Sequence, residues 1–165
     1  MASKNDDGFD KLTNQIMRKI TLLIIHCSAT PEGKDYTVED IDHWHKARGY
    51  DCKGIHIGYH YVIYRDGSIH PGRPEEMKGA HVKDHNAHSI GICYIGGMTA
   101  DNSTPKDTRT PAQKASLLTL LRQLKQKYPN AIITSHHTFN PQKTCPNFDA
   151  EHEYLQLSDN QDSSD

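Results

Sequence analysis

Residues 20–25 read Ile-Thr-Leu-Leu-Ile-Ile and are followed directly by His26. This run is apolar on both alternating faces and rich in β-branched side chains, which is typical of a strand buried inside a sheet. We therefore predict a strand over residues 20–25 that brings His26 to its end. A second strand, Ala131-Ile-Ile-Thr134, leads in the same way to His136 and His137.

Two further segments have strand patterns. Residues 58–64 alternate, and the pair Ile69-His70 follows a turn at Asp66-Gly67, so the sequence predicts a hairpin there. Residues 89–95 form another apolar run, which Gly96-Gly97 ends. A polar stretch from about residue 98 to residue 109 is expected to be an exposed loop.

Two helices are marked by their capping residues. Thr37 can cap a short helix, with Asp40 at its third position and Gly49 just past its end. Thr110 can cap a longer, leucine-rich helix that has Pro111 at its first position. Because strands and helices alternate without repeats, we predict an α/β fold with a central mixed β-sheet covered by helices.

The length of 165 residues suits one compact domain. We expect this domain to span residues 20–157. Residues 1–19 are expected to form a short amphipathic helix or to be disordered, and the polar residues 158–165 to form a disordered tail. We also expect a monomer with reduced cysteines, since the four cysteines are spread widely through the chain.

Charge and hydropathy exclude several classes of partner. The formal net charge of -2 and the lack of a Lys/Arg run argue against nucleic-acid binding. No apolar stretch approaches the roughly 20 residues needed to span a membrane. The start of the chain lacks the basic and apolar regions of a secretory signal, so we expect no membrane span and a chain that is cytoplasmic as synthesised.

Three side chains that can bind a metal lie at the ends of predicted strands or in the loop just past one. They are His26, His136 and Cys145. A catalytic zinc site has three protein ligands and leaves the fourth position to water, and two histidines with one cysteine are an acceptable set. In a mixed sheet the ends of non-consecutive strands can be neighbours. A lone histidine is more often only solvated or hydrogen-bonded, so the hypothesis of a zinc site at one edge of the sheet depends on the combination.

Several strings of residues occur together and in order. They are Ile25-His-Cys-Ser-Ala-Thr30, Gly58-Tyr-His-Tyr61, Gly79-Ala-His81, Asn86-Ala-His-Ser-Ile-Gly91, and His136-His137 followed by Lys143-Thr-Cys-Pro146. In them the chain resembles, from about residue 20 to residue 150, the type 2 N-acetylmuramoyl-L-alanine amidases. The likeness is above all to the small bacteriophage amidase lysozymes, with the animal peptidoglycan recognition proteins as more distant relatives.

This resemblance implies hydrolysis of the amide between N-acetylmuramic acid and L-alanine in bacterial peptidoglycan, with one Zn²⁺ per chain. It assigns the zinc ligands to His26, His136 and Cys145, and it gives Tyr59 and Lys143 roles in the chemistry. Zinc in such a site polarises a carbonyl and lowers the pKa of water toward about 7. Lys143 can then supply charge to the oxyanion, and Tyr59 can orient water or donate a hydrogen bond.

Other histidines are matched with less definite roles. His60 and His81 match family positions near the cleft, and we expect them to contact substrate or to support the zinc ligands. Residues 136–145 form a segment one residue longer than in the shortest phage members, which leaves His137 open as an alternative ligand. We expect His136 to be the ligand with His137 packed behind it, because successive strand residues point to opposite faces.

A second metal site built from His43, His45, Cys52 and His56 is disfavoured. His43 and His45 are two residues apart on the predicted helix and point to different faces. Structural zinc clusters also have tighter paired spacing than these four residues. Cys27 directly follows a ligand and is expected to face away from it, buried as a small apolar side chain.

Three functions are compatible with these motifs. The first is an active amidase of phage or prophage type, an endolysin that acts on the cell wall after release or delivery. The second is a non-catalytic peptidoglycan recognition module, although such a relative often lacks the full ligand set and Cys145 is present here. The third keeps the metal but cuts a different amide, because the motifs define the metal site better than the substrate groove.

Overall fold

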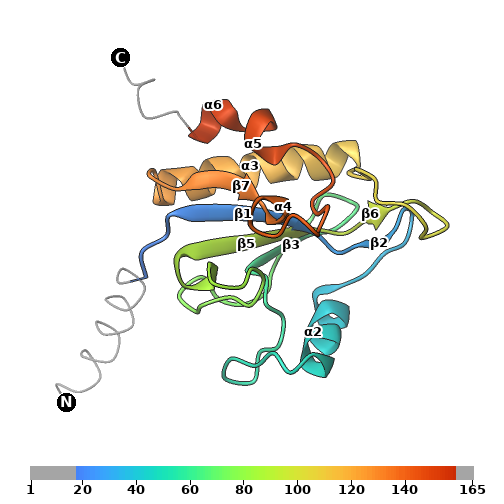
Figure 1. The fold of residues 1–165 in the computed structure, drawn as a ribbon, viewed down its shortest axis with the longest axis horizontal. Coiled ribbons are helices and arrows are strands. Elements are labelled where there is room, and N and C mark those ends of the chain that lie inside the picture. The colour runs from blue at the N-terminus through green and yellow to red at the C-terminus, as the bar shows by residue number, and fades with distance from the viewer. Residues whose placement is uncertain (1–17, 159–165) are drawn as a thin grey trace.

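Residues 18–158 are described in the computed structural model of the chain (Figure 1). The strands are β1 (Leu22–Cys27), β2 (Thr30–Pro31), β3 (Tyr61–Ile63), β4 (Ile69–Pro71), β5 (Ser89–Tyr94), β6 (Gly97–Met98) and β7 (Ile132–Ser135). The helices are α2 (Val38–Ala47), α3 (Pro111–Lys127), α4 (His136–Phe139), α5 (Ala150–Glu153) and α6 (Leu155–Ser158), with a 3-10 helix η1 at Asn86–His88.

The central sheet has the strand order β4-β3-β5-β1-β7. Strand β1 runs parallel to β5 and β7, and β3 runs parallel to β5, whereas β4 is antiparallel to β3. Strand β1 therefore lies inside the sheet, and Leu23, Ile24 and Ile25 have no exposed surface. The predicted α/β fold with a mixed sheet and a β3–β4 hairpin is confirmed.

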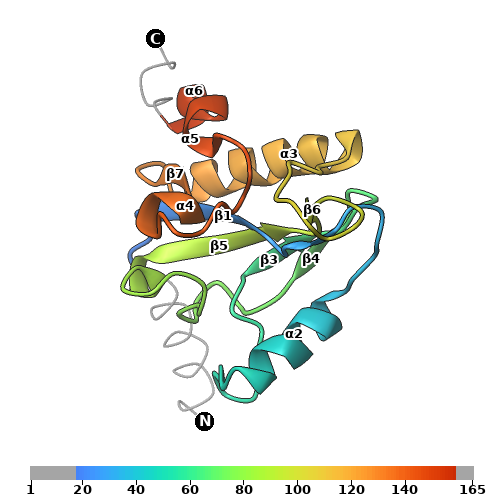
Figure 2. The ribbon, with the colours of Figure 1, turned by 45° about the vertical axis from the view of Figure 1, so that its right-hand side comes forward.

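Helices cover both faces of this sheet, with α3 on one side and α2 on the other (Figures 1 and 2). Leu121 of α3 belongs to the same buried cluster as Leu23 and Ile25 of β1. Ile41 of α2 packs in a second cluster with Val62 of β3. Because burial of one such side chain contributes about 1.5–3 kcal/mol, these alternating strand residues hold both layers to the sheet.

Both long helices begin as their capping residues predict. The Thr37 side chain accepts a hydrogen bond from the backbone of Asp40, whose carboxylate accepts one from the backbone of Thr37. Thr110 and Gln113 form the same reciprocal pair at the start of α3. Gln113 is buried and its Nε2 also donates to the backbone carbonyl of Ile63, so this cap ties α3 to the sheet.

The strand predicted over residues 58–64 is shorter than expected, because β3 covers Tyr61–Ile63 alone. The backbone nitrogen of Gly58 donates to His45 Nδ1 at 2.8 Å instead of to a neighbouring strand. A Cβ atom on Gly58 would lie 2.0 Å from the carbonyl oxygen of Ala80. A close backbone crossing therefore shapes residues 58–60, and only glycine fits at its centre.

The two ends of the described chain differ from expectation in one respect. The tail does not begin at Ser158, since this residue ends α6 and its Oγ accepts a hydrogen bond from the backbone of Ile133 at 3.0 Å. Residues 159–165 lie outside the described residues, as do residues 1–17 with their predicted short helix. Arg18 donates to three backbone carbonyl oxygens.

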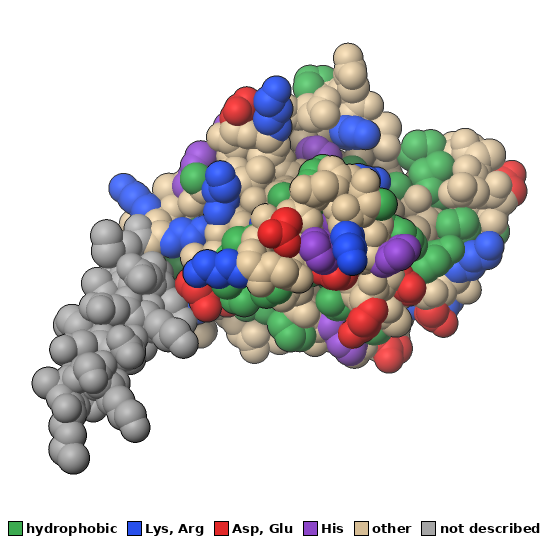
Figure 3. Space-filling model, turned by 90° about the horizontal axis from the view of Figure 1, so that it is seen from below, with side chains coloured by type: hydrophobic (Ala, Val, Ile, Leu, Met, Phe, Trp, Pro, Cys, Tyr) green, Lys and Arg blue, Asp and Glu red, His purple; other side chains and the backbone are tan. Residues whose placement is uncertain are grey.

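Charged side chains of both signs lie on the surface. Seen from below, acidic, basic and histidine side chains are interspersed on one face of the molecule (Figure 3). Within residues 18–158 we find no helix with the length and hydropathy that crossing a membrane requires.

Candidate active site

His26 and His136 come together because β1 and β7 are parallel neighbours. Ile25 pairs with Ser135 in the register of these strands, so the residue that follows each of them lies at the same edge of the sheet. The ring centroids of His26 and His136 are 4.7 Å apart. His26 lies near the end of strand β1 and is only 1% exposed, and His136 is half-buried.

Cys145 reaches the same point from the loop between α4 and α5. Its Sγ accepts a hydrogen bond from the backbone nitrogen of Cys27 at 2.8 Å. The ligand atoms of His26, His136 and Cys145 all lie within 4.8 Å of one another. Across residues 18–158, no other three His, Cys, Asp or Glu side chains form such a group.

Burial affects the protonation of all three side chains. Burial lowers the pKa of His26 well below its usual value, and burial with the nearby Lys143 lowers the pKa of His136. Both imidazoles are therefore neutral, the form that binds metals. Burial raises the pKa of the Cys145 thiol, and a cation between the three would favour its thiolate.

His26 has one ring nitrogen in use and one without a partner. Its Nε2 lies 2.8 Å from His81 Nδ1. Its Nδ1 is buried and has no hydrogen-bond partner among the described residues. An unsatisfied buried polar atom costs about 1–3 kcal/mol, and a metal ion bound at Nδ1 would satisfy this one. Two imidazoles and a thiol fit Zn²⁺ in particular.

A cavity of about 490 Å³ opens beside the metal-ligand group, and Tyr59 and Lys143 line it together with His136. The Tyr59 ring lies 5.0 Å from the His26 ring, centroid to centroid. Burial raises the pKa of the Tyr59 hydroxyl, which therefore stays a hydrogen-bond donor. The structure thus places both predicted catalytic side chains at the cavity that adjoins the metal-ligand group.

His81 and His60 differ in their access to this cavity. His81 lines it, next to His26. His60 is only 1% exposed, its Nδ1 accepts from the backbone of Gly91 and its Nε2 donates to the carbonyl of Met77. Burial and two backbone bonds do not fit substrate contact by His60. Neither bond reaches His26, His136 or Cys145, so the role that His60 shows is to join the backbones of Met77 and Gly91.

The prediction that His137 packs behind His136 is wrong. His136 is the first residue of α4 and not part of a strand, so strand alternation does not apply to this pair. Consecutive helical residues diverge by about 100°. His137 is exposed, its Nδ1 lies 2.6 Å from the carbonyl oxygen of Lys143, and its backbone nitrogen donates to the carbonyl of Cys145. His137 therefore stabilises the loop that contains Lys143 and Cys145.

The disfavoured second metal site does not form among the described residues. His43 is exposed, whereas His45 is buried and its Nδ1 accepts from Gly58. His56 Nδ1 lies 2.8 Å from a backbone carbonyl oxygen. Cys27 is buried in the cluster beneath α3, as predicted, but its thiol interacts with the thiol of Cys145, which the prediction of a purely apolar side chain did not include.

The cavity wall also contains residues that the sequence did not point to, among them His45 and Arg48. The ring centroids of His45 and Tyr59 are 5.3 Å apart. The helical spacing of Ile41 and His45 could have identified the latter as a residue on the buried face of α2. Arg48 follows α2 directly, and its charge opposes the rise in the pKa of Tyr59.

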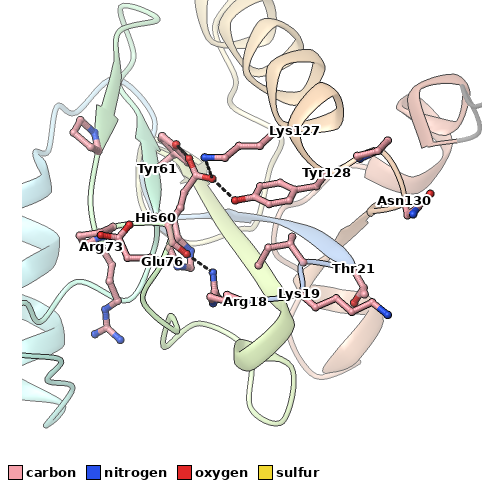
Figure 4. A pocket seen from close by; sticks show the side chains of 15 residues that line it. Arg18, Lys19, Thr21, His60, Tyr61, Arg73, Glu76, Lys127, Tyr128 and Asn130 are labelled. Atoms are coloured by element: carbon pink, nitrogen blue, oxygen red, sulfur yellow. Dashed lines mark hydrogen bonds and ion pairs between the residues drawn. The ribbon is translucent and has the colours of Figure 1, made fainter. Parts of the chain in front are cut away.

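A larger cavity of about 560 Å³ lies elsewhere, and none of the three metal-group residues lines it (Figure 4). Tyr61, Lys127 and Tyr128 line this cavity, and each of them hydrogen-bonds to the carboxylate of Glu75. These three side chains thus share one carboxylate as their hydrogen-bond partner. The smaller cavity beside His26 remains the candidate active site.

Comparison with known proteins bears directly on this site. A family model described as N-acetylmuramoyl-L-alanine amidase matches residues 16–148. The chain belongs to this amidase family. The family expected from the motif strings is therefore confirmed, and the match includes the whole metal-ligand group.

Several similar members of the amidase family are phage endolysins. Those of Klebsiella phage KP32 and Escherichia phage T7 are each 41% identical to this chain, over 127 and 128 residues, covering 77% of this chain and 80% of each relative. Among solved structures, the N-acetylmuramoyl-L-alanine amidase LysC from Clostridium intestinale URNW has a TM-score of 0.68 and 30% identity, covering 86% of both chains. Drosophila PGRP-LB, at 24% identity and a TM-score of 0.67 over 84% of this chain and 81% of its own, shares the fold.

Two buried histidines give this amidase-family member a predicted pH dependence of stability. Burial lowers the pKa of His45 and of His60 to about 4 each. The unfolded chain binds these protons near the ordinary value of about 6.5, so it is favoured as the pH falls from there toward 4. We expect the metal-free protein to keep full stability above pH 6.5 and, as the pH falls to about 4, to lose on the order of 3 kcal/mol from His60. The loss from His45 is smaller because this residue lines the cavity.

Urea unfolding in the presence of a chelator at pH 7, 5.5 and 4.5 measures this loss. The variant His60→Asn keeps an acceptor for the Gly91 backbone nitrogen and does not titrate, so its stability should vary less with pH. An equal free energy of unfolding at pH 7 and pH 4.5 for the unmodified protein would contradict the prediction.

Proposed function

We propose that the chain is a zinc-dependent N-acetylmuramoyl-L-alanine amidase that cuts the amide between muramic acid and L-alanine in bacterial peptidoglycan, as a phage-type endolysin. One observation carries this proposal, the approach of the ligand atoms of His26, His136 and Cys145 to within 4.8 Å beside a cavity that Tyr59 and Lys143 line. Membership of the amidase family and the endolysin relatives support the choice of bond and substrate.

The side chains around the cavity have separate roles in the proposed reaction. A zinc ion held by His26, His136 and Cys145 would act as a Lewis acid on the amide carbonyl and activate water. The Lys143 ammonium, close enough to His136 to lower its pKa, stabilises the negative charge that develops on the carbonyl oxygen. The Tyr59 hydroxyl, which burial keeps protonated, donates to that oxygen or orients water.

The cavity wall also supports an anionic substrate. Arg48, Lys83 and Lys143 line it, and no Asp or Glu is among the described residues that line it. Within the described part of the chain, none of the three forms an ion pair with a carboxylate. Complementary charge favours encounter with a peptide that carries free carboxylates, as the peptides of the cell wall do.

Arg48→Gln is predicted to raise KM about fivefold and to leave kcat nearly unchanged, because an exposed charge pair contributes up to about 1 kcal/mol. Initial rates on soluble muropeptides at low and high salt measure both parameters, and the defect should shrink at high salt. Arg122→Gln, at an exposed position of α3, is the matched control. An unchanged KM for Arg48→Gln would remove this residue from substrate binding.

Mass spectrometry of digested peptidoglycan tests the proposed function. Purified, zinc-loaded protein should release peptides that begin with free L-alanine and leave glycan strands with intact muramic acid. Fragments cut at another amide would replace this substrate assignment. Binding to the wall without any released fragment would instead indicate a recognition module.

A further inference from the structure

A chain of hydrogen bonds runs from the metal-ligand group into the core. His26 Nε2 lies 2.8 Å from His81 Nδ1, and His81 Nε2 lies 3.2 Å from Ser89 Oγ. Ser89 opens strand β5 and has no exposed surface. At the other end, His26 Nδ1 is buried and has no hydrogen-bond partner within residues 18–158. The series of hydrogen bonds therefore begins at the His26 ring, whose Nδ1 is a candidate metal ligand, and ends at the buried hydroxyl of Ser89.

His81 sits in a closely fitted slot. A Cβ atom on Gly91 or on Gly79 would lie 2.7 Å from His81 Cδ2, so the ring occupies the space that two missing side chains leave. The Asn86 side-chain oxygen accepts hydrogen bonds from the backbone nitrogens of His81 and Val82, at 2.9 Å each. Both the ring and the backbone of His81 are thus held in place.

The protons in the hydrogen bonds between His26, His81 and Ser89 can be arranged in two ways. In one order His26 Nε2 donates to His81 Nδ1, and His81 Nε2 donates to Ser89, which leaves His26 Nδ1 without a proton. In the other order Ser89 donates to His81, His81 donates to His26, and His26 carries its proton on Nδ1. Only the first order allows His26 Nδ1 to bind a metal.

We propose that His81 is a positioning residue. By accepting a hydrogen bond from His26 Nε2 and donating one to Ser89, it keeps the proton of His26 on Nε2 and so leaves Nδ1 free to bind the metal ion. The proposal rests on the proposed function in requiring a metal at His26. A hydrogen bond from the second nitrogen of a ligating histidine orients the ring and raises its basicity, and loss of such a partner weakens metal binding about 10–100-fold.

Zinc affinity, measured without substrate, tests this inference. Metal-free protein is titrated with zinc against a chelating dye for the unmodified chain, His81→Leu and His81→Asn. His81→Leu removes the acceptor, so its zinc Kd should rise about 10–100-fold. Asparagine carries an acceptor oxygen that can replace His81 Nδ1, so the Kd of His81→Asn should stay within about threefold.

Two results would overturn the proposal. Unchanged zinc affinity in His81→Leu would show that His26 needs no partner, and an equal loss in both variants would show that His81 only fills space. If His81→Leu gives no cooperative thermal transition, Ser89→Ala is tested instead. The proposal requires its zinc Kd to be higher than that of the unmodified protein, and an unchanged Kd refutes the proposal. Failure of the unmodified protein to bind zinc would defeat the proposed function itself.

Discussion

Cys145→Ser is expected to lose both the bound zinc and the amidase activity. A serine hydroxyl keeps its proton at neutral pH, whereas the thiolate is the form of cysteine that ligates metals. Because a metal ion contributes several kcal/mol of transition-state charge stabilisation, and each 1.36 kcal/mol is a tenfold change in rate, we expect kcat/KM to fall at least about 1000-fold. Metal analysis of the purified variant and release of L-alanine amino termini measure the two losses.

His26→Ala should give the same two losses, since it removes another member of the group. Cys52→Ser is the matched control, because Cys52 is also half-buried and is not part of the metal-ligand group. It should retain one zinc per chain and full activity. A Cys145→Ser variant that keeps both zinc and activity would show that the metal is held elsewhere.

Lys143→Ala is expected to keep zinc and to slow turnover by about 100–1000-fold, the usual effect of removing one group that stabilises an oxyanion. The loss should appear in kcat, because the oxyanion exists only in the transition state and the intermediate. Tyr59→Phe should also keep zinc and reduce kcat. Steady-state rates, with metal content measured on the same samples, separate this effect from loss of the ion.

Lys114→Ala, an exposed lysine of α3, is the control for removal of a surface charge and should be as active as the unmodified chain. Lys143→Arg should recover part of the lost rate, because it restores a positive charge with different geometry. Full activity in Lys143→Ala would remove Lys143 from the mechanism.

The metal-ligand group was predictable because it follows from local patterns and sheet geometry. The apolar run before His26 indicated a buried strand, and the run before His136 indicated another. Parallel pairing of those strands then brings the residues after Ile25 and Ser135 to one edge. Cys145 required the motif Lys143-Thr-Cys-Pro146, since no periodicity positions a loop residue.

Other features depend on tertiary contacts that the sequence does not display. The chain changes from strand to helix at His136, and this change exposes His137. It is accompanied by a hydrogen bond from the backbone of His137 to the loop that carries Cys145. The role of Gly91 is visible only when the His81 ring lies against it. The short helices α5 and α6 lack a strong apolar repeat and pack on strand β7 and helix α3.

Zinc dependence can be measured by titrating the metal-free protein with zinc and following L-alanine release at each step. We expect no release after chelation, a rise that is linear in added zinc, and a plateau at one ion per chain. Full release from chelator-treated protein, or zinc binding at one ion per chain without any release, would contradict this expectation.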